Sequence, residues 1–299
     1  MKKVKVFLFA AVATLFAGCE DAIDIIQPGE FPNPYESLSD LEKGLNGVYF
    51  AAPGENHIIF TSIFTDEVRV GIANGNQGIT DGGLSFVLNN TSDDAASIWQ
   101  GNYYLINSAN RVIEGAANIV PQNEDELNRY NTILAQARFL RAYGHFQIIS
   151  FFSPNMADDS ALGAILMDYV PEITDKPARN TNGEVYAFIE SDLDFAEANL
   201  DEDVVAETYV GATGVSKRAI LAFRARMASY REKYDLAKSY VDQLGTLALA
   251  TKGNASTSNY ISMFTPANNT TEVIFKFDRA AGGSGNFLGA WSSIDATIS

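Results

Sequence analysis

The chain has 299 residues, of which 46% are hydrophobic, and its formal net charge is −16 at pH 7. Such acidity repels nucleic acid and anionic lipid head groups, and no basic patch reverses it, so we expect no nucleic-acid partner. The one cysteine excludes an intramolecular disulfide and a thiolate metal cluster, and the two histidines lie far apart in the sequence. We therefore expect neither a metal nor a cofactor, and only a calcium site built from carboxylates alone stays open.

Residues 1–18 have the pattern of an export signal. Lysines at positions 2, 3 and 5 precede an apolar run over residues 6–17, which is too short to span a bilayer as a stable helix. The run ends in Leu15-Phe16-Ala17-Gly18-Cys19, and small residues directly before a lone cysteine resemble a bacterial lipobox. We therefore expect cleavage before Cys19 and lipidation of its thiol. The alternative is an ordinary signal peptide in which this cysteine is incidental.

Residues 19–38 are expected to form a flexible tether, because they contain Pro28, Gly29, Pro32 and Pro34. One helical domain is expected over residues 39–299. Ser39 followed by Glu42 predicts a capping box that opens a helix over residues 39–51. Residues 57–68 are apolar and fit a helix or a strand. Residues 70–94 are rich in Gly, Asn, Asp and Ser, which predicts a long irregular segment.

Two long helices joined by a short polar turn are predicted in the centre of the chain. The first covers about residues 99–119, and residues on its apolar face recur at helical spacing: Trp99, Tyr103, Ile106, Asn110 and Ile113. The second covers residues 124–152, and its apolar stripe contains Ile133, Ala137, Leu140, Gly144, Ile148 and Phe151. Three acidic residues at its start suit the positive end of the helix dipole.

More helices are predicted after a second long loop over residues 153–180. Thr181 with Glu184 forms another capping box, which opens a helix that ends near Leu200. Helices over about residues 215–232 and 234–245 carry small and aromatic residues at a spacing that loosely follows one tetratricopeptide repeat. Residues 272–277 alternate like a short strand. The predicted fold class is mainly α, with tetratricopeptide-like stacked αα-hairpins, long irregular loops and a minor β component near the C-terminus.

Polar residues on the predicted central helices have two interpretations. Arg138, Arg141 and His145 share one helical face, so they fit either an anion site or a structural network with carboxylates on neighbouring helices. We favour the structural network. Asn110 lies beside an apolar stripe, and we expect it to be a buried amide with its hydrogen bonds satisfied.

The long loops offer the side chains that hold a sugar, namely an aromatic platform with amides and charged groups beside it. From loop position and side-chain chemistry we predict ligand contacts at Asp66, Arg69, Asn76 and Trp291. Asp66 and Glu67 also resemble the carboxylate pair of a glycoside hydrolase, but that chemistry depends on a separation of ~5–9.5 Å that a sequence does not give. No nucleophile elbow, zinc-protease motif or phosphate loop is present, so we expect no catalytic residue.

Several motifs together resemble one known family, the SusD/RagB nutrient-binding outer-membrane lipoproteins of Bacteroidetes. In chain order these motifs are the lipobox at Cys19, Leu45-Asn46-Gly47-Val48-Tyr49, Asp66-Glu67, Trp99-x-x-x-Tyr103-x-x-Ile106-x-x-x-Asn110, Ala137-Arg138-Phe139-Leu140-Arg141-Ala142-Tyr143-x-x-Phe146, Asp192-Leu193-x-x-Ala196, the helix over residues 217–226 and Glu272-Val273-Ile274-Phe275. Gln136 stands where the family usually has Glu. Family members normally continue for a long region after the last motif, so the resemblance implies either a chain truncated at its C-terminus, which we favour, or a short family member with an incomplete ligand site.

The resemblance also implies a function. It implies a lipid-anchored protein of the outer membrane, exposed at the cell surface, that binds an oligosaccharide or another nutrient without chemistry on it. It implies a SusC-like TonB-dependent transporter as the partner that receives the nutrient. Two alternatives stay open, namely a helical-repeat scaffold of the cell envelope that binds only proteins and a glycoside hydrolase that uses Asp66.

Overall fold

The computed structural model describes residues 35–53, 55–65, 87–89, 91–201, 213–247, 249–250 and 272–277. Its contacts divide the chain into two units. One comprises Tyr35–Pro171 with Asp175–Ser299 and holds every helix described below. Of the other unit only Glu172–Thr174 is described, and its three side chains are exposed.

Seven helices account for most of the described residues, which confirms the mainly α prediction. They are α2 (Leu38–Ala51), α3 (Glu55–Phe64), α5 (Asp93–Ala116), α6 (Glu124–Phe152), α7 (Asn182–Asn199), α8 (Lys217–Tyr230) and α9 (Tyr234–Leu244). None of the helices in this part of the chain combines the length and the apolar character that crossing a bilayer requires.

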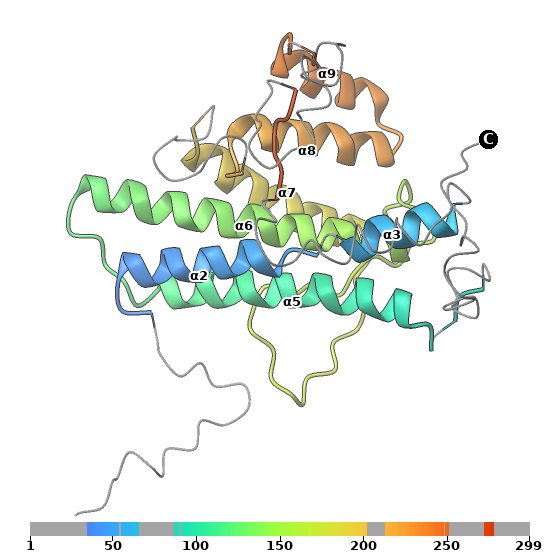
Figure 1. Cartoon of the computed structure of the whole chain (residues 1–299), viewed down its shortest axis with the longest axis horizontal. Helices are drawn as coiled ribbons and strands as arrows, with labels where there is room; N and C mark the ends of the chain where they lie inside the picture. The colour runs from blue at the N-terminus through green and yellow to red at the C-terminus, as the bar shows by residue number, and fades with distance from the viewer. Residues whose placement is uncertain are drawn as a thin grey trace, which may run out of the picture. The chain divides into compact units, whose positions relative to one another are not determined.

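The central hairpin consists of α5 and α6, as predicted. Helix α6 begins at Glu124 and ends at Phe152, the predicted bounds, and the Asn123 side chain caps it by accepting a hydrogen bond from the Glu126 N–H at 2.9 Å. Helix α5 starts earlier than its apolar stripe indicated, at Asp93, and ends at Ala116. Figure 1 shows α2 lying along both helices of the hairpin, and these three helices enclose fully buried Leu41, Leu105, Ile106 and Leu140.

The start of α2 differs from the prediction. Ser37, not Ser39, is its N-cap, and the Ser37 hydroxyl accepts a hydrogen bond from the Asp40 N–H at 3.3 Å. The Ser39 capping prediction is therefore wrong, because the serine two residues earlier takes the extended backbone conformation that a cap needs. Tyr35 falls within the predicted tether of residues 19–38, but it is 9% exposed and belongs to the core, where its ring lies against Gly44 and Gly115.

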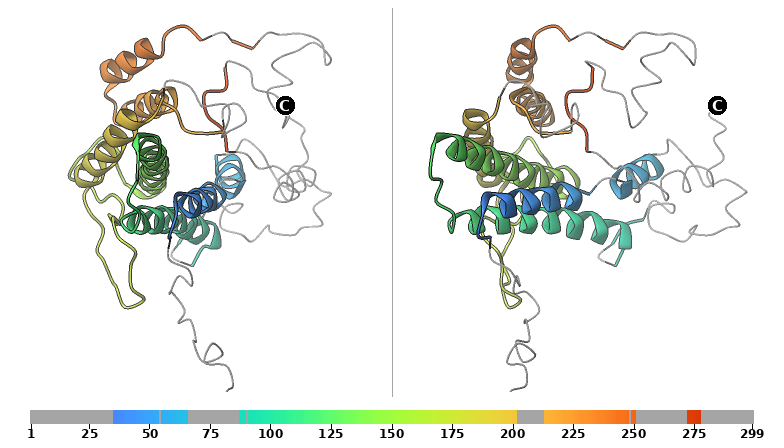
Figure 2. Two further views of the ribbon diagram at one scale, coloured as in Figure 1. Left: turned by 90° about the vertical axis from the view of Figure 1, so that its left-hand side faces the viewer. Right: turned by 60° about the vertical axis from the view of Figure 1, so that its left-hand side comes forward.

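Successive helix pairs form stacked αα-hairpins. Helix α6 contacts α5 on one side and α7 on the other, and α8 contacts both α7 and α9. Figure 2 shows this succession in two further views, with α7, α8 and α9 following one another on the side of α6 away from α5. Helix α7 opens with the predicted capping box of Thr181 and Glu184. Helix α3 settles the ambiguity at residues 57–68 in favour of a helix that ends at Phe64.

The predicted strand at residues 272–277 is wrong, since the described residues contain no strand, only an isolated bridge between Leu162 and Thr181. The six residues do not alternate between buried and exposed; all are half-buried. Phe275 lies 5.8 Å from Phe139 and Phe277 lies 5.4 Å from Tyr143, ring centroid to centroid. The apolar residues therefore pack against the side chains of α6 instead of pairing with a neighbouring strand.

The turn between α8 and α9 is closed by a Schellman motif. The Lys233 N–H donates to the Ala228 carbonyl and the Glu232 N–H donates to the Ser229 carbonyl. Glu232 consequently adopts a φ of 59°, the left-handed conformation that usually requires glycine.

We expect Glu232→Gly to stabilise the protein by about 0.5–1 kcal/mol, because glycine removes the steric cost of this conformation, partly offset by its greater freedom in the unfolded chain. Urea unfolding measures the change. Lys233→Gly is the matched control, because Lys233 has a φ of −88° and should lose stability. Equal effects of the two substitutions would contradict the assignment.

Candidate functional site

The residues predicted to contact the ligand, Asp66, Arg69, Asn76 and Trp291, lie outside the described residues, as does Cys19. The structure therefore leaves these predictions untested. Three other features are described. They are helix α3, which precedes Asp66, the loop over residues 153–180, and the polar face of α6, for which an anion site is one of the two interpretations.

Helix α3, which ends two residues before Asp66, is held on the hairpin by a buried histidine. His57 is 8% exposed, and its Nε2 lies 3.3 Å from the Asn102 Nδ2, which also donates to the Ile98 carbonyl at 2.8 Å. That second bond orients the amide so that its N–H group faces the ring, and Nε2 is the acceptor. Burial lowers the pKa of His57 to about 4, so the ring is neutral at pH 7. The Phe151 ring lies edge-on to it at 5.2 Å.

The basic face of α6 is a structural network and not an anion site. Arg141 binds Asp192 of α7 through two hydrogen bonds, Nε to Oδ2 at 2.8 Å and Nη2 to Oδ1 at 2.7 Å. The two side chains are only 6% and 2% exposed. The remaining Arg141 Nη1 donates to Asn110 Oδ1 at 2.8 Å. Arg138 lies over the Phe195 ring, 4.1 Å from its centroid. The favoured prediction for this face, and the prediction of a satisfied Asn110 amide, are both confirmed.

The same network holds a segment of the long loop, residues 163–170, which we call the strap. Its main chain is bound by side chains of the helices: Tyr103 Oη donates to the Ile165 carbonyl at 3.1 Å and accepts from the Ile165 N–H at 2.7 Å. Asn110 Nδ2 donates to the carbonyls of Met167 at 3.1 Å and Tyr169 at 2.7 Å. Glu114 accepts from the Val170 N–H at 2.7 Å. The polar residues of the α5 motif thus serve to fix the strap.

His145 joins the strap to α6. Its Nδ1 donates to the Arg141 carbonyl at 2.9 Å, and its Nε2 accepts from the Met167 N–H at 3.2 Å. These two partners, a carbonyl and an amide, define the tautomer with the proton on Nδ1. The ring is fully buried, and burial lowers its pKa to about 4, with a further contribution from the Arg141 charge. His145 is therefore neutral at pH 7.

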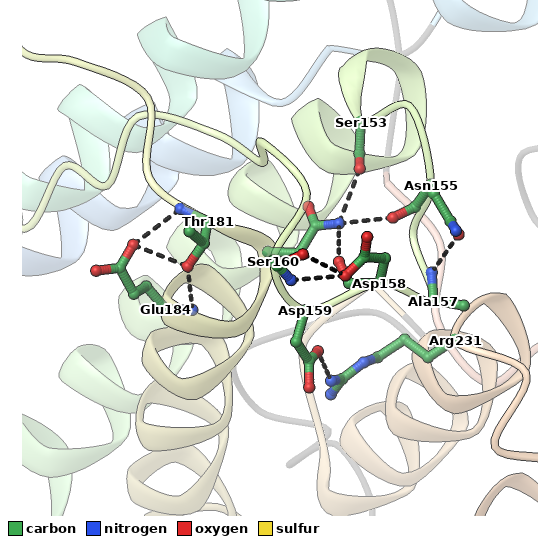
Figure 3. A network of polar contacts seen from close by, with 10 residues as sticks. Ser153, Asn155, Ala157, Asp158, Asp159, Ser160, Thr181, Glu184 and Arg231 are labelled. Carbon is green, nitrogen blue, oxygen red and sulfur yellow. Dashed lines mark hydrogen bonds and ion pairs between the residues drawn. The ribbon is translucent and has the colours of Figure 1, made fainter.

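The first part of the loop, residues 153–160, forms a second polar network (Figure 3). Buried Asn182 at the start of α7 donates to Ser153 Oγ and to the carbonyls of Asn155 and Asp158, at 2.8–2.9 Å. The Asp158 carboxylate accepts from both the hydroxyl and the N–H of Ser160, and these bonds lower its pKa. The network attaches the loop to α7, and the Asp158 carboxylate is bonded within the loop, to Ser160.

Two arginines, one on α8 and one at its C-cap, form ion pairs with carboxylates of the loop and of α7. Arg231 pairs with Asp159 and lies 3.9 Å above the centroid of the Tyr186 ring, as Figure 3 shows for the ion pair. Arg224 binds three carboxylates of α7 at once, which belong to Glu190, Asp194 and Glu197. Within the described ranges, no three His, Cys, Asp or Glu side chains gather in a way that suits a metal ion.

One buried polar contact has no signal in the sequence. Tyr49 Oη donates to Gln136 Oε1 at 2.6 Å and accepts from the Val215 N–H at 3.1 Å. Gln136 is 3% exposed, and in the sequence it stands out only because the resembling family usually has Glu at this position. Tyr49 lies 87 residues from Gln136 and 166 residues from Val215, so no local pattern indicates these contacts.

Residues 23–228 match the sequence model of the SusD-like family, described as starch-binding and associating with the outer membrane. SusD-like protein P2 of Formosa agariphila is 30% identical over 206 residues, which cover 66% of this chain and 38% of that relative. The chain spans about two fifths of the length of the curated relatives that it matches.

Solved structures share the fold. A SusD superfamily protein from Bacteroides fragilis superposes with a TM-score of 0.60 at 20% identity, over 73% of this chain and 51% of its own. A laminarin-binding SusD-like protein superposes with a TM-score of 0.58 at 21% identity, over 73% of this chain and 46% of its own. At these identities the likeness concerns the fold alone.

Proposed function

The chain belongs to the SusD-like family, and we propose that it captures an oligosaccharide at the cell surface and passes it to a SusC-like TonB-dependent transporter. The observation that carries the proposal is the family match over residues 23–228, which spans the signal-proximal segment and the whole central hairpin. A similar solved protein is named for binding laminarin, which makes β-glucans a first class of ligand to test.

Ligand contact falls, in this proposal, to the loop residues Asp66, Arg69, Asn76 and Trp291. The described helices act as a rigid scaffold, and no chemistry on the ligand is proposed. Among the described carboxylates, Asp158 binds Ser160, Asp159 pairs with Arg231 and Asp192 pairs with Arg141, so these three take part in structural contacts. A glycoside hydrolase needs one carboxylate to deliver a proton and a second to act on the sugar.

Attachment to the outer membrane is proposed through Cys19. Residues 1–18 would be removed as a lipoprotein signal, and the tether would lie between Cys19 and Tyr35, because Tyr35 already belongs to the core of the helical domain that follows. Two or three acyl chains anchor firmly, because each buried methylene contributes roughly 0.8 kcal/mol.

A protein-binding scaffold is the second candidate. It is favoured by the exposed apolar side chains at the α8–α9 end of the stack, where Tyr230 is 51%, Tyr234 66% and Val241 52% exposed. Stacked αα-hairpins use such surfaces to bind other proteins.

Affinity electrophoresis of the chain without its signal, in gels that contain starch, laminarin or other polysaccharides, tests the proposal. We expect retardation in at least one gel, and at least a tenfold loss of affinity in Trp291→Ala, since a sugar-binding aromatic platform contributes more than about 1.4 kcal/mol. Arg226→Ala, at an exposed position on α8, is the control and should bind as the parent does. Retardation by no glycan, together with capture of an envelope protein, would favour the scaffold.

The lipid anchor has its own test. Cells that express the full chain and are fed radiolabelled palmitate should yield a labelled protein, and Cys19→Ala should abolish the label because it removes the only thiol. A labelled alanine variant would place the acyl chain elsewhere, and an unlabelled parent would mean that residues 1–18 are an ordinary signal peptide.

A further inference from the structure

We propose that His145 is an acid-sensitive latch, which holds the strap of residues 163–170 against α5 and α6 and releases it when the imidazole ring is protonated. The inference concerns the strap alone and does not depend on the proposed function. It begins from the hydrogen bonds of the ring, both of which are made to main-chain groups that lie on different segments.

The strap depends on side chains to an unusual extent. Its main-chain bonds to other main chain are those that join Gly163 and Ala164 to Asn180, at 2.8 Å each. From Ile165 onward the described bonds come from side chains, among them Tyr103, Asn110 and His145. A helix keeps its internal backbone hydrogen bonds when a neighbouring side chain changes, whereas an irregular segment bonded to side chains loses the hydrogen bond that the changed side chain made. The loss of one of these side-chain partners should therefore weaken the attachment of the strap before it affects the helices.

Protonation reverses the role of the ring nitrogen that faces the strap. In the neutral ring Nε2 accepts from the Met167 N–H, whereas in the charged ring both nitrogens are donors. The Met167 N–H would then face another N–H in a buried place, with no acceptor. Met167 is 6% exposed, so water does not replace the lost bond while the strap stays closed.

The surrounding charges do not rescue the protonated ring in the closed state. Arg141, on the same helix, is positive and acts directly against protonation of His145. Asp192 of α7 is bound by Nε and Nη2 of Arg141, and the charges of Arg138 and Asp168 also act on that carboxylate. Helix α5 contributes the neutral amide of Asn110 to the network, and α7 also places the Phe188 ring edge-on at 5.3 Å.

The size of the effect follows from the two states of the ring. A pKa of about 4 in the closed state and about 6.5 in an open, hydrated state means that opening takes up a proton between these values. Stability of the closed strap is therefore complete above pH 6.5 and falls as the pH is lowered towards 4. The opening equilibrium should rise about 30-fold between pH 7.5 and pH 5.

Hydrogen exchange measured by mass spectrometry tests the latch, with protection factors corrected for the intrinsic effect of pH. Peptides that cover residues 163–170 should lose about 30-fold protection between pH 7.5 and pH 5, while peptides from α8 keep theirs. In His145→Gln the strap should show no such fall, because the Gln Oε1 accepts from Met167 and does not titrate. His57→Gln is the matched control, since it removes the other buried histidine and should leave the fall unchanged.

Three outcomes would overturn the proposal: constant protection of the strap in the parent, an equal loss in α8, or the same loss in His145→Gln. Should the Gln variant fail to fold, imidazole ¹⁵N shifts in the parent still decide. With only two histidines in the chain, His57→Gln assigns the signals. An Nε2 of His145 that is already protonated at pH 7.5 would overturn the latch as well.

Discussion

Asp192→Ala is expected to lower the free energy of unfolding by about 3–5 kcal/mol, the largest loss that we predict for a single substitution. Asp192 and Arg141 are 2% and 6% exposed and share two hydrogen bonds. Removal of the carboxylate leaves a guanidinium charge inside the protein, where neither water nor a counter-ion compensates it. Urea unfolding at pH 7 measures the loss.

A second ion pair on the same helix provides the control. Asp194 is two residues further along α7 and pairs with Arg224, but its side chain is 74% exposed. Arg224 also keeps Glu190 and Glu197 when Asp194 is removed. Asp194→Ala should therefore cost less than about 1 kcal/mol.

A double variant separates the charge from the packing. Arg141→Met with Asp192→Leu removes both charges and fills the space with apolar atoms, so it should be less destabilised than Asp192→Ala alone. If Asp192→Ala and Asp194→Ala have equal effects, or if the double variant is worse than the single one, the buried pair does not have the role assigned to it.

The helices were predictable because their signals are local. The acidic first turn of α6 and the capping box of α7 each lie within a few residues of the helix start that they mark, and the apolar stripe of α6 follows from spacing within the helix itself. Predictions were wrong where two local signals compete or where none applies. The prediction named Ser39 alone, but Ser37 offers the same hydroxyl two residues earlier, and the backbone conformation makes Ser37 the cap. Residues 272–277 alternate like a strand, but no strand occurs among the residues that the structure describes, and the apolar side chains of this segment pack against α6.

Only one of the two partners of the polar face of α6 was predictable from the sequence. The spacing of Arg138, Arg141 and His145 on α6 predicted a shared face and a carboxylate partner, which the structure supplies as Asp192. The other partner of this face is the strap, and nothing in its sequence indicates where it lies. Its contacts go from its main chain to side chains of distant helices, and such contacts require no side-chain pattern in the strap itself. The sequence therefore predicts that this segment is a loop, but it does not predict which helices the loop packs against.

The close approach of α5 and α6 gives the second large effect. Gly144 lies in the middle of α6, where helix propensity alone favours alanine by about 1 kcal/mol. A Cβ atom at this position would lie 2.8 Å from Ile106 Cγ1 and 3.4 Å from the Asn102 carbonyl oxygen. Ile106 is fully buried, so it has little room to move. We therefore expect Gly144→Ala to destabilise the protein by about 1–3 kcal/mol, because overpacking outweighs propensity.

Gly47 is the matched control for this prediction. It lies within α2, is exposed, and has no atom within 4 Å of the position that a Cβ would occupy. Gly47→Ala should stabilise the protein by about 0.5–1 kcal/mol, since only the propensity difference remains.

Shortening Ile106 to alanine tests the cause directly. Ile106→Ala is itself destabilising, because it leaves a cavity, but it removes the Cγ1 atom that meets the new methyl group. In that background Gly144→Ala should lower the free energy of unfolding by at least about 1 kcal/mol less than it does alone. A double-mutant cycle, with each variant unfolded in urea, measures this difference as the interaction free energy of the two substitutions. If the two substitutions are additive, or if Gly144→Ala is as stabilising as Gly47→Ala, the glycine is not what allows the two helices to approach.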